Sequence, residues 1–177
     1  MKKFKILTLF ALMLTFNFAC AASKQQLQES VKYIDFELPS LTTTTFKLSN
    51  IVGKKLVLLN FWATWCPYCV REIPQLKQIY ETYKDKGLEI VAVNLGDSYK
   101  EVASFAERYN IRYTILLDQK GTSARSYMVQ GIPTNFLIDL KGNIIFAGHH
   151  LPDAGLIEPN LPKLKLQKKN KTEKKQN

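Results

Sequence analysis

Cysteine and histidine are both scarce in this sequence: the 177 residues include three cysteines and two histidines. Three cysteines cannot build a framework of several disulfides, and only Cys66 and Cys69 lie close together in sequence. A zinc site is also disfavoured, because the single Cys-x-x-Cys motif has no second cysteine pair and the histidines form an isolated doublet, His149-His150. What remains is one cysteine pair whose spacing allows a small redox disulfide. No metal and no cofactor are expected.

Long apolar runs are also few, and the one nearest the N-terminus spans residues 6–19. It follows a basic start and leads into small residues around Cys20, which is the layout of a secretory signal. Its length favours cleavage over retention as a membrane anchor. A lipoprotein signal ending before Cys20, with a lipid on that cysteine, is the alternative. Either route predicts an extracytoplasmic protein, in the periplasm or at the outer face of the cytoplasmic membrane, that is secreted or lipid-anchored.

The formal net charge of +10 is unevenly distributed. Lys2, Lys3 and Lys5 supply three of these charges and residues 163–177 supply six, which leaves only +1 on residues 6–162. A nearly neutral domain gives no reason to expect a nucleic-acid partner. The basic tail has few apolar residues, so we expect it to be disordered and solvated, with adhesion to an anionic partner as the alternative. We therefore divide the chain into a signal peptide (1–22), a spacer (23–30), one domain (31–162) and a tail (163–177).

The two neighbouring cysteines lie where a predicted strand is followed by a predicted helix. The apolar run at 56–59 is typical of a strand buried on both faces, and the residues after Cys66 have the apolar spacing of a helix. Cys66 would then lie at a helix N-terminus, where free N–H groups and the helix dipole favour a thiolate. We therefore predict that Cys66 is the nucleophile and that Cys69, one turn later, is the resolving thiol. Pro67 suits the first helical turn, because the N–H that it lacks would have no partner there.

The rest of the pattern alternates strands with helices. Alternation and apolar runs predict strands at 33–38, 42–48, 56–61, 88–95, 113–117, 135–139 and 144–148, and helical spacing predicts helices from Cys66 to Gly87, after Ser98 and at about 122–128. The first two strands should form a hairpin, and the strands at 56–61 and 88–95 should be parallel because a helix separates them. A last helix, from Asp153, should be short or broken, since Pro159 and Pro162 interrupt it.

The string Phe61-Trp62-Ala63-Thr64-Trp65-Cys66-Pro67-Tyr68-Cys69, continued by Glu72 and Pro74, resembles the active site of the TlpA/ResA-like family of extracytoplasmic thioredoxin-fold thiol–disulfide oxidoreductases. The resemblance implies an α/β thioredoxin fold, with a central mixed sheet flanked by helices and an N-terminal β-hairpin extension. It also implies that Pro133 forms a cis peptide bond beside the disulfide, leaving the backbone of Ile132 free to pair with substrate. An ordinary trans turn proline is the alternative.

The resemblance also implies roles for residues around the cysteine pair. Thioredoxins have a buried aspartate where this chain has Asn60, so we expect the nearby carboxylate of Glu72 to exchange protons with Cys69. A surface glutamate beside Arg71 is the alternative. The residues expected to serve catalysis are Cys66, Cys69, Glu72 and Pro133, and those expected to bind substrate are Trp65, Pro67, Tyr68 and Ile132.

The function expected from these residues is reduction of disulfides in extracytoplasmic proteins by the cysteine pair. The family resemblance extends this expectation to cytochrome c maturation, with electrons supplied by a membrane thiol donor. A disulfide oxidase or isomerase of the same fold is an alternative, because it would use the same pair in the other direction.

Other hypotheses have less support in the sequence. A copper carrier would use His149 or His150, although adjacent loop histidines are usually solvated. The Pro67-Tyr68 dipeptide is shared with glutaredoxins, but no Gly-Gly pair follows Pro133 as it does in that family. Peroxiredoxins have a threonine three residues before their nucleophile, whereas this chain has Ala63 there.

Overall fold

The computed structural model of the chain describes residues 30–42 and 45–163. The predicted signal, the spacer except for Ser30, and the tail beyond Lys163 lie outside the described residues, so their assignments stay predictions. Within the described part, none of the helices combines the length and apolar character that crossing a membrane requires.

The elements follow one another in the alternating order that the sequence predicts. The strands are β1 (Glu37–Pro39), β2 (Thr45–Lys47), β3 (Leu56–Trp62), β4 (Leu88–Leu95), β5 (Thr114–Asp118), β6 (Thr134–Ile138) and β7 (Ile144–Gly148). The helices are α2 (Pro67–Tyr83), α3 (Tyr99–Arg108), α4 (Thr122–Ser126) and α5 (Ala154–Asn160), with short 3₁₀ helices η1 (Leu48–Asn50) and η2 (Lys84–Lys86).

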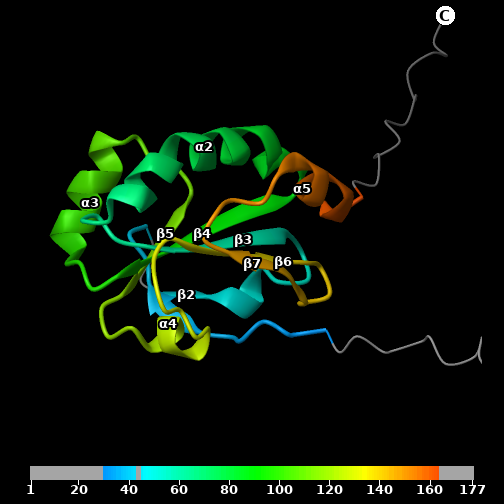
Figure 1. Cartoon of the computed structure of the whole chain (residues 1–177), viewed down its shortest axis with the longest axis horizontal. Coiled ribbons are helices and arrows are strands. Elements are labelled where there is room, and N and C mark those ends of the chain that lie inside the picture. The colour runs from blue at the N-terminus through cyan, green and yellow to red at the C-terminus, as the bar shows by residue number, and fades with distance from the viewer. Residues whose placement is uncertain (1–29, 43–44, 164–177) are drawn as a thin grey trace, which may run out of the picture. The chain divides into compact units, whose positions relative to one another are not determined.

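Five strands form one mixed sheet in the order β5-β4-β3-β6-β7 (Figure 1). β3 is parallel to β4 and β4 to β5, whereas β6 is antiparallel to both β3 and β7. Helix α2 supplies the crossover that the parallel pair β3 and β4 requires. Every residue of β3 is buried, which explains the apolar run at 56–59. The predicted α/β thioredoxin fold with a central mixed sheet is therefore confirmed.

Successive residues of β3 point to opposite faces of the sheet, and each face has its own core. Leu56 and Leu58 belong to the core beneath α2, α3 and α5, whereas Val57 and Leu59 belong to the core beneath α4 and the hairpin. Figure 1 shows α2 and α5 on one side of the sheet and α4 with β2 on the other. Asn60 follows Leu58 by two positions, so its side chain lies on the α2 face.

The predicted N-terminal hairpin is present but shorter than expected. β1 begins at Glu37 rather than at Tyr33, and β2 covers 45–47 rather than 42–48. The carbonyl of Phe36 still accepts a hydrogen bond from the N–H of Leu48 at 3.0 Å, whereas the N–H of Tyr33 donates to the carbonyl of Gly142 at 2.9 Å, close to the start of β7. Residues 33–34 therefore contact the β6–β7 turn and Tyr127 rather than extending the hairpin.

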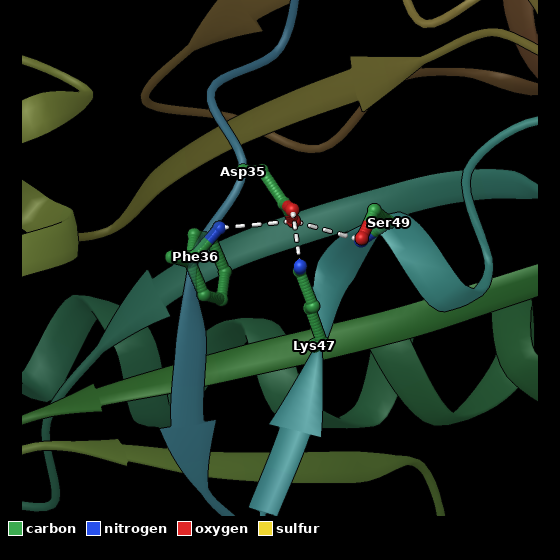
Figure 2. A network of polar contacts seen from close by, with 4 residues as sticks. All are labelled: Asp35, Phe36, Lys47 and Ser49. Atoms are coloured by element: carbon green, nitrogen blue, oxygen red, sulfur yellow. Dashed lines mark hydrogen bonds and ion pairs between the residues drawn. The ribbon is translucent and has the colours of Figure 1, made fainter.

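Asp35 fixes the point at which the chain enters β1. Its Oδ1 accepts hydrogen bonds from the N–H groups of Phe36, at 3.1 Å, and Ser49, at 2.8 Å. Its Oδ2 lies 3.6 Å from Nζ of Lys47, the last residue of β2 (Figure 2). One carboxylate thus joins the start of β1 to the end of β2 and the first turn of η1.

The helix boundaries follow local sequence signals. Gly87, with φ +93°, follows η2 and ends the long helical segment. Ser98 and Glu101 form the reciprocal capping box of α3. The last helix, α5, is short as predicted, with Pro159 in its final turn and Pro162 beyond its end.

Candidate active site

Cys66 is the N-cap residue of α2, just after the turn that follows β3. Its Sγ accepts a hydrogen bond from the N–H of Cys69 at 3.2 Å, and its own N–H donates to the carbonyl of Ala63 at 3.3 Å. Pro67 occupies the first helical position, as predicted. The two cysteines form a disulfide, their Cα atoms are 5.3 Å apart, and each is 3% exposed. The sulfur of Cys66 therefore lies at the positive end of the helix, where a thiolate is favoured.

A loop before β6 brings Pro133 beside this disulfide. The Ile132–Pro133 peptide bond is cis, as predicted. The carbonyl oxygen of Ile132 lies 3.6 Å from Sγ of Cys66, which in the disulfide has no hydrogen to donate. The carbonyl oxygen of Pro133 lies 2.8 Å from Nδ1 of His149. Because a carbonyl only accepts, Nδ1 is the donor, and His149 thereby supports the loop.

A groove of about 450 Å³ opens next to the disulfide, and its lining residues are Tyr68, Arg71, Glu72, Gln75, Gly131, Ile132, Pro133 and His149. Trp65 and Tyr68 are 68% and 66% exposed, which is unusual for large aromatic side chains. The guanidinium carbon of Arg71 lies 4.3 Å from the centre of the Tyr68 ring. The region around the cysteines therefore offers exposed aromatic surface, a cation and a recess.

Glu72 lies one turn beyond Cys69 on α2 and lines the groove. Its Oε2 accepts a hydrogen bond from Nδ2 of Asn135 at 3.3 Å, and Oδ1 of Asn135 accepts one from Nδ2 of Asn60 at 2.8 Å. Burial raises the pKa of Glu72 above its ordinary value, while the Asn135 hydrogen bond and the charge of His150 act in the opposite direction. Glu72 is thus connected to two strands of the sheet rather than only to its own helix.

A second polar cluster, which the sequence analysis missed, supports the turn before Cys66. Oδ2 of Asp97 accepts hydrogen bonds from the N–H of Thr64 and from Nδ2 of Asn94, both at 2.8 Å. The N–H of Asp97 donates in return to Oδ1 of Asn94 at 3.2 Å. Asp97 is only 8% exposed, so this buried carboxylate connects the end of β4 to the backbone just before the cysteine pair.

The sequence analysis did not assign Asn135 to the site either, although one feature of the sequence marks both Asn135 and Asn94. Each is the single asparagine of a mostly apolar strand, and both are fully buried. A buried amide is costly unless its hydrogen bonds are satisfied, so such a residue points to a specific partner. The partner itself could not be named from the sequence.

A metal ion in a protein is held by several ligand side chains that lie close together. Across residues 30–42 and 45–163, no three histidine, cysteine, aspartate or glutamate side chains are grouped so that they could share a metal ion.

The profile of the AhpC/TSA family matches residues 7–147, most of the chain. The chain belongs to the AhpC/TSA family. The thiol-disulfide oxidoreductase ResA of Geobacillus kaustophilus (strain HTA426) is 42% identical over 110 residues, which are 62% of this chain and 63% of the relative. The thioredoxin-like protein YneN of Bacillus subtilis (strain 168) is 42% identical over 121 residues, which are 67% of this chain and 69% of that protein. The predicted resemblance to ResA-like proteins is confirmed.

A solved structure is also similar to this AhpC/TSA-family chain. The crystal structure of a Chlorobium tepidum protein described as a thiol:disulfide interchange protein DsbE has a TM-score of 0.66 and 35% sequence identity. The superposition covers 76% of this chain and 96% of that protein. By contrast, the match to the Geobacillus ResA spans a little under two thirds of that relative's length, at 63%.

Proposed function

We propose that this chain is an extracytoplasmic thiol–disulfide oxidoreductase that reduces disulfides in other proteins through Cys66 and Cys69. The observation that carries the proposal is a disulfide at the N-terminus of α2 that adjoins an open groove and the carbonyl of Ile132. Relatives named thiol-disulfide oxidoreductase support the same reaction.

The reaction starts from the reduced pair. The Cys66 thiolate attacks one sulfur of the substrate disulfide, the substrate S–S bond breaks, and the other substrate sulfur leaves as a thiolate that takes a proton from water. The thiolate of Cys69 then attacks the sulfur of Cys66 in the mixed disulfide and releases the second substrate sulfur. Two electrons pass from the enzyme dithiol to the substrate, and the enzyme is left with the disulfide of the structure.

Glu72 is proposed to take the proton from Cys69 in the second step. It lies one helical turn from Cys69, on the same face of α2, and lines the groove. Burial raises the pKa of Glu72, which brings its proton affinity closer to that of a thiol and makes proton transfer more favourable. Glu72→Gln should therefore slow closure of the mixed disulfide, most strongly below the pKa of the Cys69 thiol.

Substrate is proposed to lie across the groove. Trp65, next to Cys66, and Tyr68, in the groove lining, are exposed and offer aromatic surface to a peptide, and Pro67 lies between the two cysteines. The backbone of Ile132 is proposed to pair with an extended substrate segment, as in other cases of strand addition. Pro133 holds this backbone beside the reactive sulfur.

The setting of the reaction is also proposed. The predicted signal at 1–22, or a lipid on Cys20, would place the domain outside the cytoplasm. Each turnover oxidises the cysteine pair, so a donor must re-reduce it, and a membrane thiol protein is the source that the family resemblance implies. Apocytochrome c is the substrate implied in the same way.

Trapping experiments test this function. In the reduced full chain, Cys69→Ser should accumulate a mixed disulfide with a protein substrate that a thiol reagent releases, because the resolving thiol is absent. Cys66→Ser should form no such adduct and should not reduce the substrate. An adduct that forms with Cys66→Ser but not with Cys69→Ser would reverse the assigned roles, and no turnover by the native pair would contradict the proposal.

A further inference from the structure

Two asparagines beneath Glu72 face each other across β3 and β6. Asn60 and Asn135 are directly opposite in the antiparallel register, and they are 2% and 0% exposed. Directly opposite side chains lie on the same face of a sheet, and the face of Asn60 is the one that α2 covers. The pair therefore forms a buried polar path from the central strand to the carboxylate on α2.

The hydrogen bonds give this path a direction. Nδ2 of Asn60 donates to Oδ1 of Asn135, which leaves Nδ2 of Asn135 to donate to Oε2 of Glu72. An amide carries its oxygen and its N–H groups on opposite branches, so the first bond orients the second. An N–H donor favours the charged form of a carboxylate, whereas an amide oxygen in its place would favour the protonated form.

We propose that the Asn60–Asn135 pair is a positioning device that keeps Glu72 ready to accept a proton by presenting an N–H group to its carboxylate. The inference rests on the proposed function, in which Glu72 takes the proton of Cys69. Neither asparagine contacts the sulfurs in this scheme. Both act through Glu72, so their effect on thiol chemistry should disappear when Glu72 cannot ionise.

The residue types explain why an asparagine at position 60 suits this arrangement. An ionised aspartate there would only accept hydrogen bonds, so Asn135 would turn its N–H groups toward position 60 and its oxygen toward Glu72. That oxygen could pair with Glu72 only when Glu72 is protonated. Asn60→Asp should therefore reverse the polarity of the path, and it also adds a negative charge that disfavours ionisation of Glu72.

Other titratable groups lie near Glu72 and need control. They are Cys69 and Arg71 on α2, Tyr113 just before β5, and His149 and His150 just after β7. The positive charge of His150 lowers the pKa of Glu72, and the charge of Glu72 contributes to raising that of Tyr113. A titration of Glu72 must therefore be compared between variants that leave these groups unchanged.

The test is a direct titration of Glu72 in the reduced full chain. Glutamate is labelled with ¹³C at the carboxyl carbon, the Glu72 signal is identified by its loss in Glu72→Gln, and its chemical shift is followed with pH. Asn135→Leu should tighten proton binding by Glu72 about tenfold, because a hydrogen bond to the charged form is lost. Asn60→Leu should shift the titration in the same direction by less, because Asn135 then loses its fixed orientation. Leu137→Ala, on the same face of β6 and fully buried, is the matched control and should leave the midpoint in place.

A second measurement tests whether the Asn60–Asn135 pair affects the reactivity of the thiols. The rate at which the reduced enzyme reacts with a small disulfide is measured against pH for the native chain, Asn135→Leu, Glu72→Gln and the double variant. Asn135→Leu should move the pH profile of the native chain, and should have no further effect in the Glu72→Gln background.

The outcomes separate the two proposals. If Glu72→Gln moves the pH profile but the asparagine variants leave the Glu72 titration in place, or shift it to lower pH, the positioning role is wrong. If Glu72→Gln itself leaves the pH profile unchanged, the proposed proton transfer fails instead. If Asn135→Leu does not fold, Asn60→Leu and Asn60→Asp still decide the question, since both must shift the Glu72 midpoint upward.

Discussion

Asp97→Ala is expected to destabilise the protein strongly, although Asp97 lies outside the cysteine motif. The carboxylate is 8% exposed and accepts two hydrogen bonds at 2.8 Å, from Thr64 N–H and from Nδ2 of Asn94. A hydrogen bond to a charged group contributes about 1.5–3 kcal/mol, and part of this gain is offset by desolvation of the carboxylate. Removing both bonds and leaving two donors without a partner should therefore lower the free energy of unfolding by about 2–4 kcal/mol.

Asp97→Asn separates the loss of the hydrogen bonds from the loss of the charge. One oxygen accepts both bonds, so an amide oxygen in its place can keep both in a weaker, neutral form. This variant should lose about 1 kcal/mol, well under the alanine variant. Asp85→Ala is the control, because Asp85 is exposed in η2 and its removal should change stability by less than about 0.5 kcal/mol.

The assay is urea unfolding of the oxidised full chain, with the midpoint and slope determined for each variant. The slope should stay constant, since the variants remove polar contacts and not a structured region. An Asp97→Ala loss below about 1 kcal/mol, or equal losses for alanine and asparagine, would refute the reasoning that this carboxylate secures the turn before Cys66.

Three further predictions concern stability and substrate binding. Asp118, which accepts hydrogen bonds from Thr122, Ser123 and Ala124, has its pKa lowered because these bonds outweigh the burial that would raise it. The stabilisation that ionised Asp118 provides should therefore be present above about pH 4 and be lost as the pH falls further. Asp118→Ala should lower the free energy of unfolding by about 3 kcal/mol at pH 7, and this difference from the native chain should shrink in unfolding curves recorded in acid. Leu76→Ala should cost about 2–5 kcal/mol in urea unfolding because this side chain of α2 is 2% exposed, and a cost near zero would mean that the core beneath α2 is not closely packed. Trp65→Ala should leave stability within about 0.5 kcal/mol, since the ring is 68% exposed, but should slow reduction of a protein disulfide more than that of a small one; equal slowing would argue against a peptide contact.

Most of the fold could be predicted because its signals are local. The predicted strand at 88–95 coincides with β4, and the predicted strand at 56–61 lies within β3, because a strand buried on both faces is mostly apolar on both of them. The cap of α3 by Ser98 and the end of the helical segment at Gly87 depend on neighbouring residues only. The predicted bounds of the hairpin were less accurate, since residues 33–34 form hydrogen bonds with parts of the chain about a hundred residues away.

In the candidate site, too, the parts that depend on local sequence were predictable and the parts that depend on distant residues were not. The placement of Cys66, Cys69 and Pro67 depends on one strand-to-helix junction, so the sequence motif was sufficient to predict it. The hydrogen bond between Asn60 and Asn135 joins residues 75 apart in the sequence and exists only because β3 and β6 adopt one particular register. A register set by a whole sheet is not visible in the sequence of either strand.

The measurement that tests the central claim most directly is the reduction potential of the Cys66–Cys69 couple, obtained by equilibrating the full chain with defined mixtures of a thiol and its disulfide. A protein that reduces disulfides requires a potential near that of thioredoxin, about −270 mV, and this is the value that the proposed function predicts. A potential near that of DsbA, about −120 mV, would mean that the pair oxidises its partners, and the disulfide oxidase would replace the reductase.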